Sequence, residues 1–407
     1  MATVLQPTPD TPVRDTPLPF HRPHLTEDEC AAVLQALRSG WLTTGRECQA
    51  FERELAGYLA VPFAAALNSC TAGLHLGLLV AGVKPGDAVV TTPLTFCASV
   101  NVIEHVGARP VLVDVDPVTG CLDPAQLEGL PADLPVKVLL PVHYAGNACA
   151  LDALWGWVED RGATLLSDCA HALETRIAGR SLAELSDLAA YSFYATKNLT
   201  TGEGGCLTSH NPDWAERIAR LRLHGMSADA LRRYEPGQRP TYDVAEPGFK
   251  YNLTDPAAAL GRLQLAAIEA HWVRRAEIVG AYMAGLAPLV EAEALRFLVP
   301  EPSAQTPRDR TAYHLCPIVL NPDRWGIDRD TAIAALQNEG ICTSVHFTPV
   351  HRFSYYATKY GWREGAFPVA EAIGANEISL PLHPWLTPDE VGEVVEAFHR
   401  IWSRYRR

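Results

Sequence analysis

The chain has 407 residues, of which 48% are hydrophobic and 20% charged, a composition typical of globular proteins with a large buried core. Its formal net charge of −13 repels phosphate backbones and anionic lipid surfaces, so we expect no general binding to nucleic acid or membranes. No apolar run is long enough to cross a bilayer and no secretory signal is visible, so we expect a cytoplasmic protein.

The ten cysteines form no CxxC pair and no spacing typical of a zinc site. Several lie inside apolar runs, as Cys316 does. We therefore expect reduced, buried thiols, with neither a disulfide framework nor a metal site.

The chain begins with residues 1–17, which are rich in Pro and Thr and predict a flexible tail. Residues 27–60 follow a helical pattern that breaks at 39–45. Short apolar runs then alternate with helical stretches. The expected strands are Ala64–Asn68, Ala88–Thr92, Val111–Val115, Val136–Val142, Ala163–Ser167, Ala189–Phe193 and Gly205–Thr208. The expected helices between them are Thr71–Ala81, Ala98–Val106, Ala150–Arg161 and Asp213–Leu223.

This alternation predicts an α/β fold with a mostly parallel seven-stranded sheet and helices on both faces. A long helical pattern over Asp255–Leu286 follows the sheet. Beyond it lie two strand-like runs, His314–Leu320 and Cys342–Phe347, with helical stretches at Arg329–Glu339 and Pro388–Arg400. We therefore expect a large domain over residues 18–285 and a smaller C-terminal α+β domain over 286–407.

Three stretches at expected strand ends carry polar groups suited to chemistry. The small-residue turn at 68–73 (NSCTAG) precedes a helix, where free N–H groups favour a phosphate, although an ordinary helix cap is the better interpretation of any such turn taken singly. Asp168 ends an apolar strand and either caps the next helix or holds a cationic nitrogen. In such sheets the ligand binds at the carboxyl ends of the strands.

Lys197 follows the third strand end. Most lysines are solvated at the surface. The apolar and hydroxylic flanks of Lys197, and the glycine-rich turn at 202–205 (GEGG), favour instead a desolvated amine that acts as a nucleophile.

From about residue 18 onward the sequence resembles the DegT/DnrJ/EryC1/StrS sugar aminotransferases, which have the fold-type I architecture of pyridoxal-phosphate (PLP) enzymes. The stretch at 249–255 (FKYNLTD) is most similar to enzymes that aminate a UDP-4-keto-pentose, of the 4-amino-arabinose type, and to relatives that act on 4-keto-hexoses. The matching motifs lie at 39–45, 141–146, 168–171, 192–197, 202–205, 248–255 and 379–384.

The resemblance implies a role for each matching residue. Lys197 matches the lysine that forms the Schiff base, Asp168 the acid paired with the pyridine nitrogen, and His171 the residue near the ring's 3-hydroxyl. Phe96 matches the aromatic that stacks on the ring, although some relatives carry Trp or Tyr there.

Further matches concern the cofactor phosphate. Cys70 and Thr71 match its binding turn, with Cys70 at a position where relatives often have Gly, and Ser192 supplies a hydroxyl. Asn252 matches a residue that reaches the cofactor phosphate of the neighbouring subunit, which implies a homodimer with shared sites.

The remaining candidates concern the substrate. Thr44 lines a sugar pocket or merely ends a helix, and His314 and His346 contact substrate or are structural histidines. Lys250 is suited to a sugar-nucleotide diphosphate. For Arg232 and Arg233, solvated surface charge is the better interpretation.

These assignments predict transfer of an amino group, with glutamate as donor, to a nucleotide-linked keto sugar at C4, in two half-reactions. Another enzyme of the same fold, such as a lyase or a cyclitol aminotransferase, stays open. The family's dehydratases replace the lysine by histidine, so Lys197 speaks against them. A catalytically silent, PLP-binding regulatory protein would not need Lys197, Asp168 and the GEGG turn together.

Overall fold

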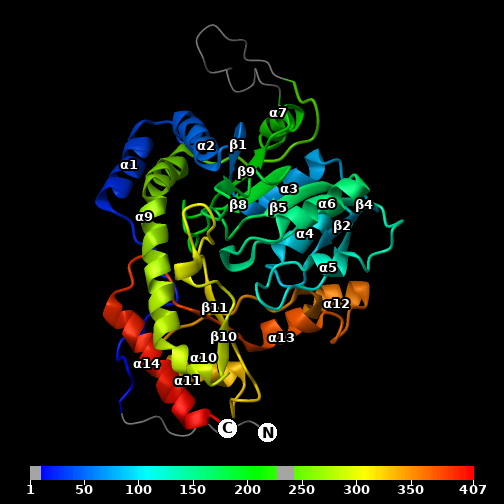
Figure 1. Ribbon diagram of the computed structural model, residues 1–407. Coiled ribbons are helices and arrows are strands. Elements are labelled where there is room, and N and C mark those ends of the chain that lie inside the picture. Colours follow the sequence, from blue (N-terminus) through cyan, green and yellow to red (C-terminus); the bar gives the residue numbers. More distant parts are fainter. Residues whose placement is uncertain (1–10, 227–242) are drawn as a thin grey trace.

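The computed structural model describes residues 11–226 and 243–407. Its larger part is built on a seven-stranded sheet, and its smaller part on a three-stranded one. Figure 1 shows helix α9 running along both parts, and it contacts α1 and α2 of the large part as well as α14 of the small part.

The strands of the large sheet are β1 (Phe63–Leu67), β2 (Ala88–Thr91), β3 (Arg109–Leu112), β4 (Val136–Leu139), β5 (Thr164–Asp168), β8 (Leu188–Ser192) and β9 (Gly205–Ser209). Its helices are α1 (Glu27–Arg38), α2 (Arg46–Leu59), α3 (Cys70–Val80), α4 (Ala98–His105), α5 (Pro124–Leu127), α6 (Leu151–Arg161) and α7 (Pro212–Leu221). A short hairpin consists of β6 (Arg176–Ile177) and β7 (Arg180–Ser181), and α9 spans Asp255–Gly285.

The strand order of the large sheet is β1-β9-β8-β5-β4-β2-β3. The pairs from β8 to β3 are parallel, whereas β9 runs antiparallel to both of its neighbours. The predicted mostly parallel, seven-stranded sheet is therefore confirmed.

Alternate residues of strands such as β1, β5 and β8 enter two separate cores, one on each face of the sheet. Leu165 of β5 belongs to a core that includes α2 and α6, while Leu166 belongs to a second core that includes α3 and α7. Such strands must be apolar on both faces, which is why they appear in the sequence as short continuous runs.

The small part contains α10 (Ala287–Glu291), β10 (Leu295–Phe297), β11 (Cys316–Leu320), α11 (Arg329–Asn338), α12 (Ser354–Tyr360), α13 (Pro368–Asn376), β12 (Glu377–Leu380) and α14 (Pro388–Tyr405). Strands β10, β11 and β12 form its antiparallel sheet in that order. The expected strand at His314–Leu320 begins only at Cys316, so His314 precedes it.

The expected strand at Cys342–Phe347 is wrong. This segment makes one isolated bridge, between Ser344 and Ser379, and no ladder. Beyond that bridge the backbone groups of His346 bond to side chains, since His346 N–H donates to Glu377 Oε2 at 2.7 Å and Tyr144 Oη donates to the His346 carbonyl at 2.5 Å. A backbone that bonds in this way cannot continue a sheet.

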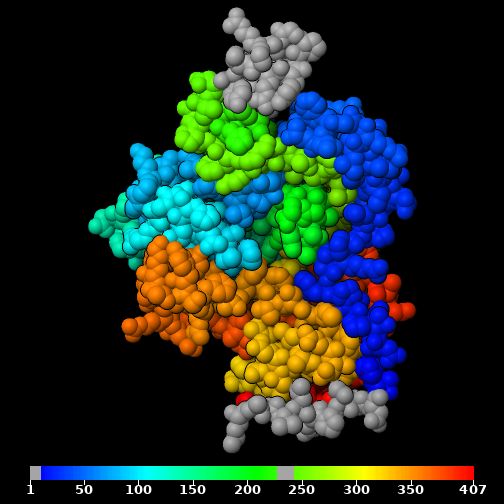
Figure 2. All heavy atoms as spheres, turned by 180° about the vertical axis from the view of Figure 1, so that it is seen from behind, coloured from blue at the N-terminus to red at the C-terminus, as the bar shows by residue number. Residues whose placement is uncertain are grey.

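The N-terminal segment lies against the small part, as the blue edge of Figure 2 shows. Arg14 forms an ion pair with Glu393 at 2.5 Å, and Leu18 accepts a backbone hydrogen bond from Cys342 at 3.0 Å. The predicted flexible tail therefore does not include these residues, because specific partners hold them. Residues 1–10 of that predicted tail lie outside the described residues.

All ten cysteines are free thiols, and most are buried, as expected. Within the described ranges, no helix is long and apolar enough to span a membrane, and no cluster of His, Cys, Asp or Glu side chains is arranged to hold a metal ion.

Candidate active site

A cavity of about 480 Å³ lies at the carboxyl ends of β1, β5 and β8, where the small part adjoins the large sheet. Most of the predicted site residues line it, although they come from six separate stretches of the chain. Those residues are Cys70, Thr71, Phe96, Asp168, His171, Ser192, Lys197, His314 and His346.

The predicted phosphate turn forms the N-terminus of α3. Ser69 is the N-cap, and its Oγ accepts a hydrogen bond from Ala72 N–H at 3.1 Å. The N–H groups of Cys70 and Thr71 therefore belong to the first helical turn, where they lack intrahelical partners. A Cβ on Gly205 would lie 2.4 Å from the backbone nitrogen of Cys70, so only glycine lets β9 approach this turn so closely.

The carboxylate of Asp168 is buried but well held. It accepts hydrogen bonds from Ser99 Oγ at 2.8 Å and from Ala170 N–H at 3.1 Å, and Cys70 Sγ lies 3.9 Å away. Burial raises the pKa of Asp168, against the effect of these donors and of Lys197. A buried carboxylate of this kind is stabilised by a cationic partner within the cavity.

The amine of Lys197 lies across the same cavity. Burial lowers its pKa to about 8, although Cys70 and Asp168 oppose this change. Its Nζ lies 3.4 Å from Nε2 of His314. An amine with such a pKa is neutral often enough near physiological pH to act as a nucleophile.

His171 presents a hydrogen-bond donor to this space. Its Nδ1 lies 3.3 Å from the N–H of Ala145 and accepts from it. Burial lowers the pKa of His171 well below its ordinary value, so the ring is neutral and carries its proton on Nε2. Its ring also stacks on Phe347, with the centroids 5.9 Å apart.

Phe96 and His346 lie at other walls of the cavity. Phe96 is 62% exposed, and its ring centroid is 6.2 Å from that of Phe347. His346 Nδ1 lies 2.8 Å from Ser379 Oγ. Burial lowers the pKa of His346 to about 3, so the imidazole is neutral.

Thr44, Lys250 and Asn252 do not line this cavity. Asn252 Nδ2 donates to Thr44 Oγ1 at 2.7 Å, and Thr44 Oγ1 donates to the Leu253 carbonyl at 2.6 Å. Lys250 is exposed beside them. Arg232 and Arg233 lie outside the described residues.

Sequence reasoning missed several residues around this site, including Ser99, Glu174 and Asn198. Ser99 lies on α4, three residues after Phe96, and nothing in the sequence marks it. Glu174 and Arg275 form a fully buried ion pair, and the position of Arg275 within a long apolar helical pattern is a signal that could have indicated it.

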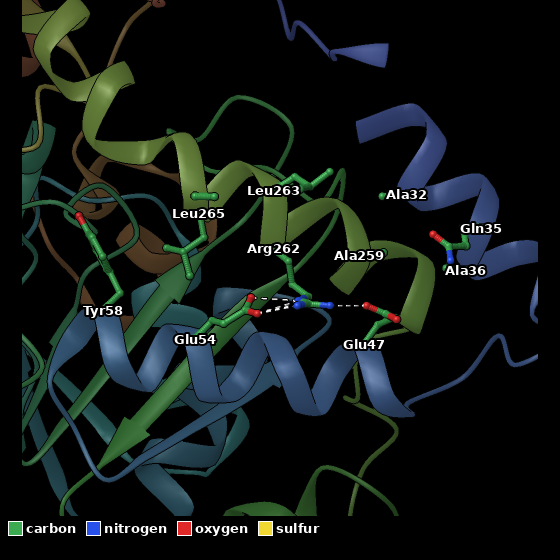
Figure 3. Close-up of a pocket in the computed structure, with 11 residues that line it drawn as sticks. Ala32, Gln35, Ala36, Glu47, Glu54, Tyr58, Ala259, Arg262, Leu263 and Leu265 are labelled. Carbon is green, nitrogen blue, oxygen red and sulfur yellow. Dashed lines mark hydrogen bonds and ion pairs between the residues drawn. The ribbon is translucent and has the colours of Figure 1, made fainter. Parts of the chain in front are cut away.

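A second groove, of about 590 Å³, lies between α1, α2 and α9 (Figure 3). Its charged groups are paired with one another, because Arg262 forms ion pairs with Glu47 at 2.8 Å and with Glu54 at 2.7 Å. It contains neither a lysine nor a cysteine. This groove therefore offers neither an amine nor a thiol, whereas the first cavity contains the desolvated amine of Lys197.

The first cavity fits pyridoxal phosphate. It combines a helix N-terminus for a phosphate, a buried carboxylate that stabilises a protonated ring nitrogen, and an amine of lowered pKa. With the mostly parallel sheet beneath it, this set of groups defines a PLP-dependent aminotransferase of fold type I.

The chain belongs to the DegT/DnrJ/EryC1/StrS aminotransferase family, whose model matches residues 23–399. It is 39% identical to the spore coat polysaccharide biosynthesis protein SpsC of Bacillus subtilis, over 94% of this chain and 97% of that protein.

Solved structures agree with this assignment. Spr1654 from Streptococcus pneumoniae, described as a putative sugar aminotransferase and solved in its PMP form, is 34% identical with a TM-score of 0.86, over 95% of this chain and 99% of that one. DesI, solved in the presence of its TDP-sugar product, is 27% identical with a TM-score of 0.84, over 97% and 95% of the two chains. The chain is therefore a sugar aminotransferase.

Proposed function

We propose that this enzyme moves an amino group from glutamate to the C4 keto group of a nucleotide-linked sugar, with Lys197 as its catalytic residue. The observation that carries the proposal is the buried amine of Lys197, which shares one cavity with the Asp168 carboxylate and the free N-terminus of α3. The TDP-sugar product in the DesI structure supports a nucleotide-linked substrate.

The site residues have two kinds of role: some hold the cofactor, and Lys197 moves a proton. The first-turn N–H groups of α3 and the Ser192 hydroxyl hold the phosphate, Asp168 keeps the ring nitrogen protonated, and the ring of Phe96 covers one face. Bound pyridoxal phosphate supplies an electron sink for the carbanion that transamination requires. The Lys197 amine, once free, moves the proton as a general base and then as a general acid.

His171 and His346 complete the polar wall. The Nε2–H of His171 is suited to donate to the 3-hydroxyl oxygen of the cofactor. Ser379 Oγ lies between Glu377 Oε1, at 2.5 Å, and His346 Nδ1, at 2.8 Å, and burial raises the pKa of Glu377 to about 8. The Ser379 hydroxyl therefore holds the orientation of the His346 ring, whose Nε2 is left to bond with substrate.

We further propose that the working form is a homodimer with shared sites. Asn252 and Thr44 bond to each other outside their own cavity, and Trp41 and Leu42, which precede Thr44 in the chain, have large, apolar, exposed side chains. Lys250, two residues before Asn252, is exposed as well. Pairing with a second copy would bury these apolar side chains and bring Asn252 to the partner's cofactor phosphate and Lys250 to its sugar nucleotide.

The test of this function is a panel of nucleotide-linked 4-keto and 3-keto sugars and keto-cyclitols, incubated with the holoenzyme and glutamate and analysed by mass spectrometry. We expect a product with one amine in place of the C4 ketone, and glutamate alone should convert the cofactor's absorbance to that of its aminated form. Amination of cyclitols only, or failure of glutamate, aspartate, glutamine and alanine alike, would contradict the proposal.

A paired measurement tests Lys197 itself. Lys197→Ala should lose the borohydride-reducible attachment of the cofactor, whereas Lys84→Ala, which changes an exposed lysine, should keep it. An attachment that survives in Lys197→Ala would disprove the assignment of the amine.

A further inference from the structure

Behind Lys197 lies a chain of hydrogen bonds that begins at a buried ion pair. Glu174 is 0% exposed and Arg275 is 1% exposed, and the guanidinium of Arg275 pairs with the Glu174 carboxylate. Charges this deep are costly unless further hydrogen bonds satisfy them. Asn198, the residue directly after the lysine, supplies two of those bonds.

The partners of Asn198 fix the orientation of its amide. Its Nδ2 lies 3.0 Å from both carboxylate oxygens of Glu174 and 3.1 Å from the carbonyl oxygen of Ala312. These three atoms can only accept, so the NH₂ group must face them and Oδ1 must face the other way. Oδ1 then lies 3.1 Å from Nδ1 of His314.

The amide in turn fixes the imidazole. An amide oxygen can only accept, so Nδ1 of His314 carries the proton. Burial and the nearby Lys197 lower the pKa of His314 well below its ordinary value, so the ring is neutral and Nε2 keeps a lone pair. That lone pair faces the Lys197 amine at 3.4 Å.

We propose that Asn198, anchored by Glu174, is a positioning residue that holds His314 as its Nδ1–H tautomer, so that Nε2 accepts a hydrogen bond from the Lys197 amine. This inference rests on the role proposed above for Lys197. The contact directs one N–H of the amine toward His314 and therefore leaves the amine's lone pair free to point elsewhere. His314 then acts on the amine rather than on the substrate.

The tautomer also affects protonation of the amine. An Nε2 acceptor stabilises the ammonium form, whereas an Nε2–H donor would oppose it. The other titratable groups that influence Lys197 or are influenced by it come from β5, α3 and three loops. They are Asp168, Cys70, His21, His171 and His346.

The first test measures the pH dependence of Lys197 acylation in the cofactor-free full chain, with acetic anhydride and mass spectrometry. Asn198→Leu removes the amide at nearly constant volume. Because His314 is then no longer held as the acceptor, we expect the pH at which Lys197 acylation is half-maximal to fall by about one pH unit. His314→Leu should lower it similarly, and the double variant should fall no further than either single one.

Asn147→Leu is the matched control. Asn147 is a buried amide whose NH₂ group donates to the carbonyls of Thr119 and Leu298, and it forms no bond with Glu174, Asn198, His314 or Lys197. Its midpoint should equal that of the unchanged protein, with exposed Lys84 as the internal rate standard. An unshifted Asn198→Leu, or additive shifts in the double variant, would overturn the proposal.

The second test uses the unchanged protein and needs no Asn198 variant. In the ¹⁵N-histidine-labelled protein, His314 should show a protonated Nδ1 and an unprotonated Nε2, and the reverse pattern would overturn the proposal. Both tests work without sugar and amino donor, so their outcome is separate from that of the substrate panel.

Discussion

At the scale of single residues, the Asp168 carboxylate depends on a hydroxyl from another helix. Ser99 Oγ donates to it at 2.8 Å, and this bond favours the ionised form, which burial disfavours. Ser99→Ala should therefore weaken cofactor binding about tenfold, the effect of a charge-assisted hydrogen bond of ~1.4 kcal/mol. Equilibrium dialysis of pyridoxal phosphate measures this.

Ser181→Ala provides the control for that measurement. Ser181 is an equally buried serine whose Oγ donates to the Leu59 carbonyl, away from the cavity. Its cofactor affinity should match that of the unchanged enzyme. Equal losses in both variants would mean that Ser99 acts on general stability and not on Asp168.

The pKa of Lys197 sets a pH dependence for cofactor uptake. Burial lowers this pKa to about 8. As the pH increases toward 8, the neutral fraction of the amine therefore rises about tenfold per pH unit, and above pH 8 it levels off. The rate of covalent cofactor attachment, followed by stopped-flow absorbance, should follow the same curve. A rate that keeps rising to pH 10 would show a lysine with its ordinary pKa.

The sequence could indicate those residues that place a charged or polar group at the end of an apolar strand. Lys197, Asp168 and the turn at Cys70 each stand at a strand end, and the sheet rule then predicts that they meet. Ser99 and Asn198 could not be predicted in this way, because their roles depend on distances between separate segments. His314 was expected to contact substrate or be structural, and the structure brings it to Lys197 instead.

At the scale of elements, β9 and the N-terminus of α3 are fitted backbone to backbone. Gly205→Ala would place a Cβ 2.4 Å from the Cys70 nitrogen, and backbone cannot move aside as a flexible side chain can. We expect a loss of ~1–3 kcal/mol in the free energy of unfolding, together with weaker cofactor binding. Urea denaturation and dialysis measure the two effects.

Gly57→Ala is the contrasting change. Gly57 lies within α2, and an added Cβ would meet no atom within 4 Å. Alanine there should stabilise the protein by ~0.5–1 kcal/mol because it restricts the unfolded chain and suits a helix. Destabilisation by both alanines would show that the close approach at Gly205 is not the cause.

The elements predicted best are those that are buried on both sides. Strands such as β5 and β8 are short apolar runs, and the structure places all seven within a few residues of their predicted positions. The short strands β10 and β12 were not predicted, and Cys342–Phe347 has the composition of a strand. Its backbone bonds to the Glu377 and Tyr144 side chains, a tertiary contact that local sequence cannot reveal.

At the scale of the whole molecule, shared sites predict complementation. Lys197→Ala and Asn252→Ala should each reduce activity, but a mixed dimer of the two contains one site with both native residues. Mixing equal amounts of the variants and allowing subunits to exchange should restore activity toward about one quarter of the native value, because about half of the dimers are then mixed and each has one native site of two. Absence of recovery, with exchange verified by native mass spectrometry, would show that Asn252 does not serve the partner.

The small part is docked on the large one by specific contacts. The N–H groups of Val369 and Ala370 donate to the Asp114 carboxylate at 2.9 Å, and α9 contacts helices of both parts. His314, which lies before β11, reaches Lys197 across this junction. The junction therefore positions the amine as well as joining the two parts.

The antiparallel strand β9 has a consequence for the order of folding. Strand β1, which leads into the phosphate turn, has β9 as its only strand neighbour in the large sheet, and β9 comes about 140 residues later in the chain. This long loop must close before β1 can join the sheet, and such closure is slow because of its entropy cost. We therefore expect the phosphate-binding turn to be complete only after β9 has inserted, late in folding.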